Sequence, residues 1–83
     1  MYPFTNKGLK QYLKETLKTD SLVIPKSIKL QKRWVESSKA GNELFSEFHF
    51  ETEDGNKYKL IARGKRNKDG DSEWTHIESI NKF

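Results

Sequence analysis

The stretch Glu43–Gly64, ELFSEFHFETEDGNKYKLIARG, decides the fold of this chain. Apolar and polar residues alternate on both sides of the segment Glu53–Asn56, which offers glycine and asparagine for a tight turn. Alternation with a period of two is typical of strands that bury one face. The pattern therefore predicts two antiparallel strands joined by a turn.

The parity of the apolar positions determines the length of that turn. A two-residue loop would put Phe50 and Leu60 on opposite faces, whereas a three-residue loop puts them opposite each other on one face. The longer loop also sets acidic side chains against basic ones on the other face. We therefore expect the register Glu53 with Lys57, Glu51 with Lys59, Phe48 with Ala62 and Glu47 with Arg63.

A helix is predicted before the hairpin. Thr5 or Asn6 provides an N-terminal cap, and we expect the helix to run to about Lys18. One side of it has the spacing of a buried stripe, formed by Leu9, Tyr12, Leu13 and Leu17. This stripe predicts that the helix packs on the sheet face that carries the even-numbered residues.

Residues 27–36 fit two patterns. As a strand they place Ile28, Leu30 and Trp34 on one face, with Lys32 as the exception. As a helix their apolar side chains spread over nearly half of the circumference. We favour the strand and keep the helix as the alternative.

The remaining segments complete the fold. We expect a loop over residues 37–42, a polar turn over 64–71 and a last strand over 72–80. The prediction is an α+β fold in which one N-terminal helix packs on a four-stranded antiparallel β-meander. With 83 residues, the chain is expected to form a single small domain, residues 1–83.

The composition excludes several kinds of site. There is no cysteine, which excludes a disulfide framework and a thiolate metal site. Asp69, Asp71 and Glu73 alternate as in part of a calcium loop, but the downstream ligands of such a loop are missing. We therefore expect neither a metal ion nor a cofactor. No segment is apolar enough to span a bilayer, which predicts a cytoplasmic protein without a membrane partner.

The net charge of +4 conceals a strong segregation of charge. Residues 1–42 carry nine basic and three acidic side chains, residues 43–56 carry five acidic ones, and residues 57–68 carry six basic ones. Such a pattern fits cross-strand ion pairs on a solvated sheet face, or a basic surface that binds nucleic acid. The residues assigned to nucleic-acid binding are Lys7, Lys10, Lys14, Lys18, Lys57, Lys59, Lys65 and Arg66.

A second candidate surface is apolar. The face of the sheet turned away from the core is expected to carry more apolar side chains than a solvated face needs. These side chains are Val35, Phe45, Ile61 and Ile77. They predict a patch that binds a protein partner or a second copy of the chain, and they leave the oligomeric state open.

The two histidines are expected on opposite faces of the sheet. His49 shares the outward parity of Glu47 and Arg63, whereas His76 shares the inward parity of Trp74. Two histidines on opposite faces cannot act as one acid–base pair unless a β-bulge turns one of them around.

A family resemblance involves three of these residues. Glu47 in FSEF, Arg63 after YKLIA and His76 in EWTHIESI follow one another along a meander, and this order resembles that of the barnase-like microbial ribonucleases. The resemblance covers about residues 44–83 and lacks the longer N-terminal helical region of that family. It implies Glu47 as general base, His76 as general acid and Arg63 as the cation that stabilises the phosphate, in cleavage of RNA through a 2′,3′-cyclic phosphate.

Two functions follow for the whole chain. The first is a small, non-enzymatic binding protein whose basic surface engages nucleic acid or a nucleoprotein complex. Such a protein could act as an inhibitor or adaptor encoded on a mobile element such as a phage or plasmid. The alternative is a barnase-like endoribonuclease of the toxin type that uses Glu47, Arg63 and His76.

Overall fold

The computed structural model describes residues 1–39, 41–66 and 69–83. It contains one α-helix, one turn of 3-10 helix and a five-stranded sheet with the strand order β1-β5-β4-β3-β2, in which all neighbours are antiparallel. The elements are β1 (Tyr2–Pro3), α1 (Asn6–Glu15), η1 (Pro25–Ser27), β2 (Lys29–Ser38), β3 (Gly41–Glu51), β4 (Lys57–Arg66) and β5 (Ser72–Lys82). The α+β class is confirmed.

The predicted number of strands is wrong by one. The short strand β1 adds to the free edge of β5, where Tyr2 pairs with Ile77 and Pro3 with His76. Two residues that include a proline carry no alternation, so a pattern with a period of two could not reveal this strand. The four longer strands form the predicted meander.

The helix has the predicted cap and the predicted buried stripe. The backbone N–H of Gly8 donates to Oγ1 of Thr5 at 3.0 Å. The helix ends at Glu15, earlier than expected, and Lys18 beyond it is in the left-handed region with a φ of 57°. The stripe packs into the core cluster. Leu9 and Leu13 are buried there, and Tyr12 and Leu17 are partly buried.

The central hairpin has the expected parity but a different register. Phe50 lies opposite Tyr58 and Phe48 opposite Leu60, a shift of two residues from the prediction. Beyond the pair Glu51–Lys57 the chain turns, with the N–H of Thr52 donating to the carbonyl oxygen of Asn56 and the N–H of Gly55 donating to that of Thr52. Thr52 also forms a bridge with Val23. The pairs Glu53–Lys57, Glu51–Lys59, Phe48–Ala62 and Glu47–Arg63 are therefore wrong, although every apolar residue keeps its predicted face.

Residues 27–36 are mainly a strand, but an irregularity changes which side chains share a face. The register of β2 against β3 shifts at Gln31, so Trp34 lies opposite Phe45 and Val35 opposite Leu44. The bulge explains why Lys32 interrupts the alternation in the sequence. Trp34 therefore lies on the face away from α1, not on the core face.

Two predicted loops are shorter than expected. The β2–β3 ladder continues through the pairs Ser37–Asn42 and Ser38–Gly41, so most of the predicted loop 37–42 is strand. Similarly, β4 extends to Arg66. The two predicted loops also cover residue 40 and residues 67–68, which lie outside the described residues.

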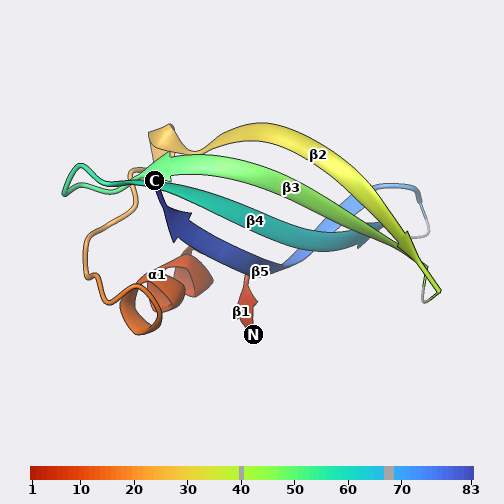
Figure 1. The fold of residues 1–83 in the computed structure, drawn as a ribbon, viewed down its shortest axis with the longest axis horizontal. Helices are drawn as coiled ribbons and strands as arrows, with labels where there is room; N and C mark the ends of the chain where they lie inside the picture. The colour runs from red at the N-terminus through yellow and green to blue at the C-terminus, as the bar shows by residue number, and fades with distance from the viewer. Residues whose placement is uncertain (40, 67–68) are drawn as a thin grey trace.

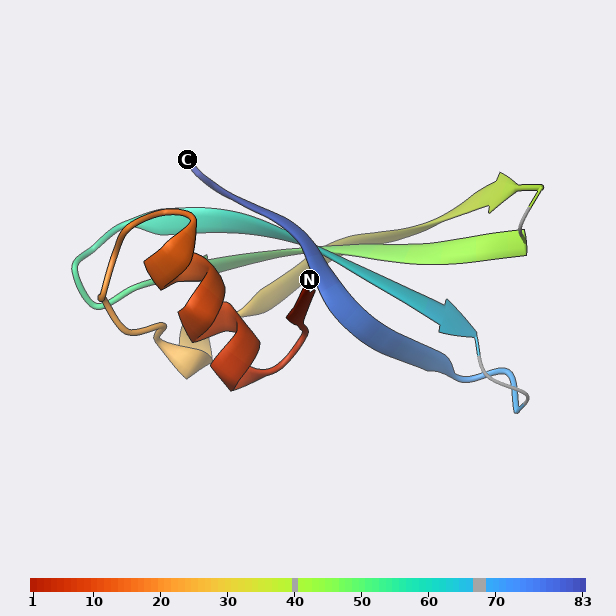
Figure 2. The same cartoon turned by 90° about the horizontal axis from the view of Figure 1, so that it is seen from below.

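The helix covers one end of the sheet only. Figure 1 shows α1 beneath one end of the twisted sheet, and Figure 2 shows the β2–β3 and β4–β5 pairs diverging at the other end. The molecule measures 40 × 22 × 21 Å along its principal axes. Its core lies between α1 and the inner face of the sheet and contains Leu9, Leu13, Phe50, Tyr58, Leu60, Ala62, Ile77 and Ile80. We call the opposite face of the sheet, which α1 does not cover, the outer face.

Candidate functional site

The strand β5 contains a bulge that turns His76 to the outer face. Trp74 pairs with Gly64 and His76 pairs with Arg63, so Thr75 is an extra residue between them. The hydroxyl of Thr75 donates to the carbonyl oxygen of Arg63 at 3.1 Å. The expectation that His76 points inward together with Trp74 is therefore wrong, because the bulge breaks the parity that the expectation assumed.

A second irregularity in β5 keeps the following apolar residues in the core. The register shifts again between the pairs Ile61–Ser79 and Ala62–Ile77. The bulge at Thr75 already puts Ile77 on the inner face, where 4% of its surface is exposed, and this second shift, which comes after Ile77, returns Ile80 to the same face. Both residues belong to the core. The prediction that Ile77 belongs to an outer patch is wrong.

Two other members of the predicted apolar patch do lie on the outer face. Phe45 and Ile61 are there, whereas Val35 shares the inner face with its partner Leu44. Phe45 is buried beneath Trp34, whose ring stacks on it with centroids 5.4 Å apart. The four residues Val35, Phe45, Ile61 and Ile77 therefore do not form one patch.

Four residues form a row across the outer face, one on each of the four long strands. We call Trp34, Phe45, Arg63 and His76 the Arg63 row, because each of them pairs with the next across β2, β3, β4 and β5. The guanidinium of Arg63 lies 5.2 Å from the ring centroid of Phe45. The row thus places two stacked rings, a guanidinium and an imidazole side by side on the face that α1 does not cover, with Phe45 buried under Trp34 and the side chain of His76 16% exposed.

Arg63 has acidic partners on both neighbouring strands. It forms ion pairs with Glu43 on β3 and with Glu78 on β5, the latter at 3.5 Å. Glu78 also lies 3.5 Å from Nε2 of His76. The Nε atom of Arg63 is buried and has no hydrogen-bond partner among the described residues. About a third of the side chain remains exposed, so the guanidinium is accessible from the outer face.

Glu47 lies on the same face, two residues along β3 from Phe45. One of its carboxylate oxygens lies 2.9 Å from Nε2 of His49, and the other lies 3.9 Å from Nζ of Lys32. The side chain is 16% exposed. Its position is therefore held from two sides, which orients the carboxylate on the sheet surface.

The three residues of the ribonuclease resemblance thus share one face on three consecutive strands. Glu47 is on β3, Arg63 on β4 and His76 on β5. Arg63 and His76 lie opposite each other, whereas Glu47 lies opposite Ile61, two residues further along the strands. The strand spacing of about 4.8 Å and a rise of about 3.4 Å per residue place the backbones of Glu47 and His76 about 12 Å apart. This arrangement could not be read from regular alternation, because the bulge at Thr75 that produces it leaves no pattern in the sequence.

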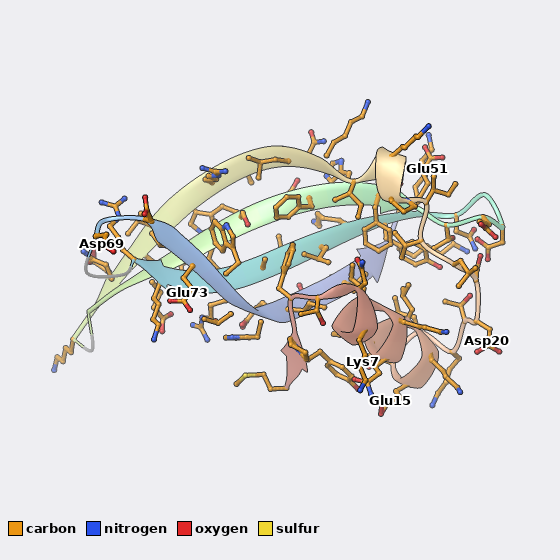
Figure 3. The ribbon with its side chains drawn as sticks, turned by 180° about the vertical axis from the view of Figure 1, so that it is seen from behind. Lys7, Glu15, Asp20, Glu51, Asp69 and Glu73 are labelled. Carbon is orange, nitrogen blue, oxygen red and sulfur yellow. The ribbon has the colours of Figure 1, made fainter. Side chains whose placement is uncertain are left out.

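The basic residues assigned to nucleic-acid binding are divided between different parts of the molecule. Lys7, Lys10 and Lys14 are exposed on α1, whereas Lys59 and Lys65 follow the outward parity of β4. Figure 3 shows Lys7 on the helix, and Asp69 and Glu73 at the far end of the sheet. The other assigned cations are Lys18 after the helix, Lys57 at the start of β4 and Arg66 at its end. The eight predicted residues therefore do not form one continuous surface.

Within the described parts of the chain, no helix is long and apolar enough to cross a membrane. Over the same residues, no three or more His, Cys, Asp and Glu side chains are grouped as the ligands of a metal ion. No protein-family model, curated protein or solved structure matches the chain. The resemblance to the barnase-like ribonucleases stays a prediction.

Proposed function

We propose that the outer face binds RNA and cleaves its phosphodiester bonds by acid–base catalysis. The observation that carries this proposal is the pairing of His76 with Arg63 on the outer face, produced by the bulge at Thr75. Glu47 on the same face supplies the second titratable group. A carboxylate, a cation and an imidazole on one face are the groups that phosphoryl transfer to an internal hydroxyl needs.

The reaction assigns one role to each group. The carboxylate of Glu47 takes the proton of the ribose 2′-hydroxyl, and the 2′-oxygen attacks phosphorus. A bond forms between the 2′-oxygen and phosphorus, the bond from phosphorus to the 5′-oxygen breaks, and protonated His76 gives its proton to that leaving oxygen. Arg63 stabilises the negative charge that develops on the phosphoryl oxygens. The products are a 2′,3′-cyclic phosphate and a free 5′-hydroxyl.

The chemistry selects RNA, since DNA has no 2′-hydroxyl to act as the nucleophile. The ring pair next to Arg63 supports the same choice. Trp34 is only partly buried and lies over Phe45 at a spacing suited to stacking. A partly exposed ring beside a cation is a common platform for a base of a single strand.

Binding of RNA without cleavage is the second candidate. The ion pairs of Arg63 favour this candidate over cleavage, because Glu43 and Glu78 compete with the reacting phosphate for the guanidinium. In this case the ring pair and the surrounding lysines hold the strand, and the acidic residues only orient Arg63. Such a protein would act as a binding module or an adaptor, which is the function the charge distribution predicts.

The experiment that tests the proposal is cleavage of a fluorescent oligoribonucleotide in the presence of EDTA. We expect products that end in a 2′,3′-cyclic phosphate, and no cleavage where the ribose is replaced by 2′-deoxyribose. His76→Ala and Glu47→Gln should each reduce the rate by about 10²–10⁴-fold. The matched control is Glu51→Gln, the same exchange on the same strand and face at a side chain with 46% exposure.

Each outcome separates the two candidates. Cleavage that is lost in both variants and retained in the control supports catalysis. Binding of the oligonucleotide without cleavage supports the second candidate, and cleavage that neither substitution changes would come from a contaminant. Neither binding nor cleavage at low salt would overturn both.

A further inference from the structure

A cleft opens at the end of the sheet that α1 does not cover. The pairing of β3 with β4 ends at Leu44 and Gly64, and beyond this point the β2–β3 and β4–β5 pairs diverge. The space between them is a cavity of about 180 Å³. We call it the fork cleft, and its lining consists of Arg33, Trp34, Val35, Leu44, Phe45, Arg66 and Trp74.

The apolar part of the fork cleft is held in place by close packing. Trp74 pairs with Gly64, and a Cβ atom on Gly64 would lie 2.8 Å from the indole ring. Only glycine therefore allows the ring to pack against the β4 backbone in this way. Leu44, the other partner of Gly64, is buried, whereas Val35 next to it is 52% exposed. The cleft thus presents an aromatic ring packed on the β4 backbone and an exposed apolar side chain.

The charged part of the fork cleft has no acidic partner among the residues that the structure describes. Arg33 on β2 and Arg66 on β4 are both exposed, and neither forms an ion pair with a described residue. Arg63, by contrast, has two acidic partners. The chain has only three arginines beside thirteen lysines, so two of the three guanidinium groups line one small cleft. Planar guanidinium groups are suited to the bidentate binding of phosphate.

We propose that the fork cleft binds one nucleotide of a single-stranded RNA, with the base on Trp74 and the adjacent phosphates on Arg33 and Arg66. The cavity is smaller than the roughly 300–1,000 Å³ of a pocket for a drug-sized ligand, which fits one base. Trp34 and Phe45 belong to both the cleft lining and the Arg63 row. These two residues lie on the outer face, whereas Val35, Leu44 and Trp74 lie on the inner face. The cleft therefore lies between the two faces, at the point where β3 and β4 separate.

This assignment rests on the proposed function in one respect only, the choice of RNA as the ligand. It adds a position for a neighbouring nucleotide, away from the groups that perform the chemistry. We therefore expect the protein to bind longer oligonucleotides more tightly than a dinucleotide, because only a longer strand reaches both Arg63 and the fork cleft.

The test uses the fluorescence of Trp74. In a Trp34→Phe background, which keeps a ring on Phe45, Trp74 is the only tryptophan of the chain. A non-cleavable 2′-O-methyl hexanucleotide should quench it on binding, because a stacked base is a quencher. Adding Arg33→Ala and Arg66→Ala should weaken binding at least tenfold, since each removes a charge-assisted hydrogen-bonding group. Arg33→Lys with Arg66→Lys should recover only part of the affinity.

The charge-matched control is Lys26→Ala with Lys82→Ala. It removes the same charge from η1 and from the end of β5, both at the other end of the sheet. An equal loss of affinity in this control and in the double arginine variant would overturn the proposal. Absence of quenching by RNA, or equal quenching by an acidic peptide such as oligoglutamate, would overturn it too.

The outcomes also separate this site from the proposed function. If the protein cleaves no RNA but Trp74 responds to the hexanucleotide, the fork cleft stands and the catalytic role of the outer face fails. If cleavage occurs and Trp74 does not respond, the cleft fails and the catalytic role stands.

Discussion

His76 lies directly opposite Arg63 on the outer face, although Trp74, two residues before it, lies on the inner face against Gly64. In a regular strand, residues two positions apart share a face. The extra residue Thr75 removes this constraint and allows an indole on one face and an imidazole on the other. The ion pairs around Arg63 then connect three strands through Glu43 on β3 and Glu78 on β5.

Removing one acidic partner of Arg63 should strengthen RNA binding. Glu78 lies 3.5 Å from both Arg63 and His76, so its carboxylate competes with a phosphate for the same groups. We expect Glu78→Gln to raise the affinity for a non-cleavable oligonucleotide several-fold, and Glu73→Gln, the same exchange earlier on β5, to raise it less. Fluorescence anisotropy at fixed salt measures both. An equal effect of the two substitutions would mean that only net charge matters.

The core should depend more on Phe50 than on Phe48. Phe50 is 2% exposed and belongs to the central cluster, whereas Phe48 is only partly buried and packs at its margin. Phe50→Ala should therefore cost about 3–5 kcal/mol of the free energy of unfolding, and Phe48→Ala clearly less. Urea denaturation gives both values. A larger loss for Phe48→Ala would show that the core has been placed wrongly along β3.

Gly8 should be irreplaceable in α1 despite the low helix propensity of glycine. A Cβ atom there would lie 1.9 Å from the carbonyl oxygen of Pro3 in β1. The gain in helix propensity from Gly8→Ala is about 1 kcal/mol, whereas the clash forces β1 or the helix to move. We expect a net loss of about 1–3 kcal/mol, measured by thermal or urea unfolding. Gln11→Ala, at an exposed position of the same helix, is the control and should be nearly neutral.

The turn between β3 and β4 should make stability depend on pH in the acid range. The hydroxyl of Thr52 donates to the carboxylate of Asp54, which together with bonds from Asn56 and Ser21 lowers the pKa of that carboxyl below its ordinary value of 3.8. A lowered pKa means that the stabilisation is complete above the unfolded-state pKa and is lost as the pH falls through the folded-state value.

The melting temperature of wild type should therefore exceed that of Asp54→Asn above about pH 5, and the two should converge below about pH 3. Glu53→Gln, a substitution at the neighbouring exposed carboxylate, should show no such convergence. A difference between wild type and Asp54→Asn that persists unchanged at pH 2.5 would mean that the charge of Asp54 has no role.

The sequence predicts the inner face of the sheet well because burial imposes a strict period. Phe48, Phe50, Tyr58 and Leu60 all lie on the predicted face, and the stripe of α1 packs against the sheet as expected. The alternation does not determine the register, since a shift of two residues keeps every side chain on its face. In this chain the register follows from the turn, in which the N–H of Thr52 donates to the carbonyl oxygen of Asn56 and the N–H of Gly55 donates to that of Thr52. Thr52 also forms a bridge with Val23.

The outer face was not predictable in the same way. Its composition depends on the irregularities at Gln31 and Thr75 and on the register shift near Ala62. Each of them moves the residues that follow it to the other face, and polar sequences tolerate a bulge without leaving a periodic signal. Trp34, Val35, His76 and Ile77 all lie beyond one of these points, and all four are on the face opposite to the one predicted.

The most direct test of the account compares deletion of Thr75 with deletion of His76. Either deletion removes the bulge and leaves Trp74 and Ile77 facing inward, so both variants should fold, as a cooperative melt will show. They differ in which side chain then lies opposite Arg63, histidine in the first and threonine in the second. We predict that the protein without Thr75 still cleaves RNA to 2′,3′-cyclic phosphate products, and that the protein without His76 does not. Two folded variants with the same activity, whether both cleave or neither does, would contradict it.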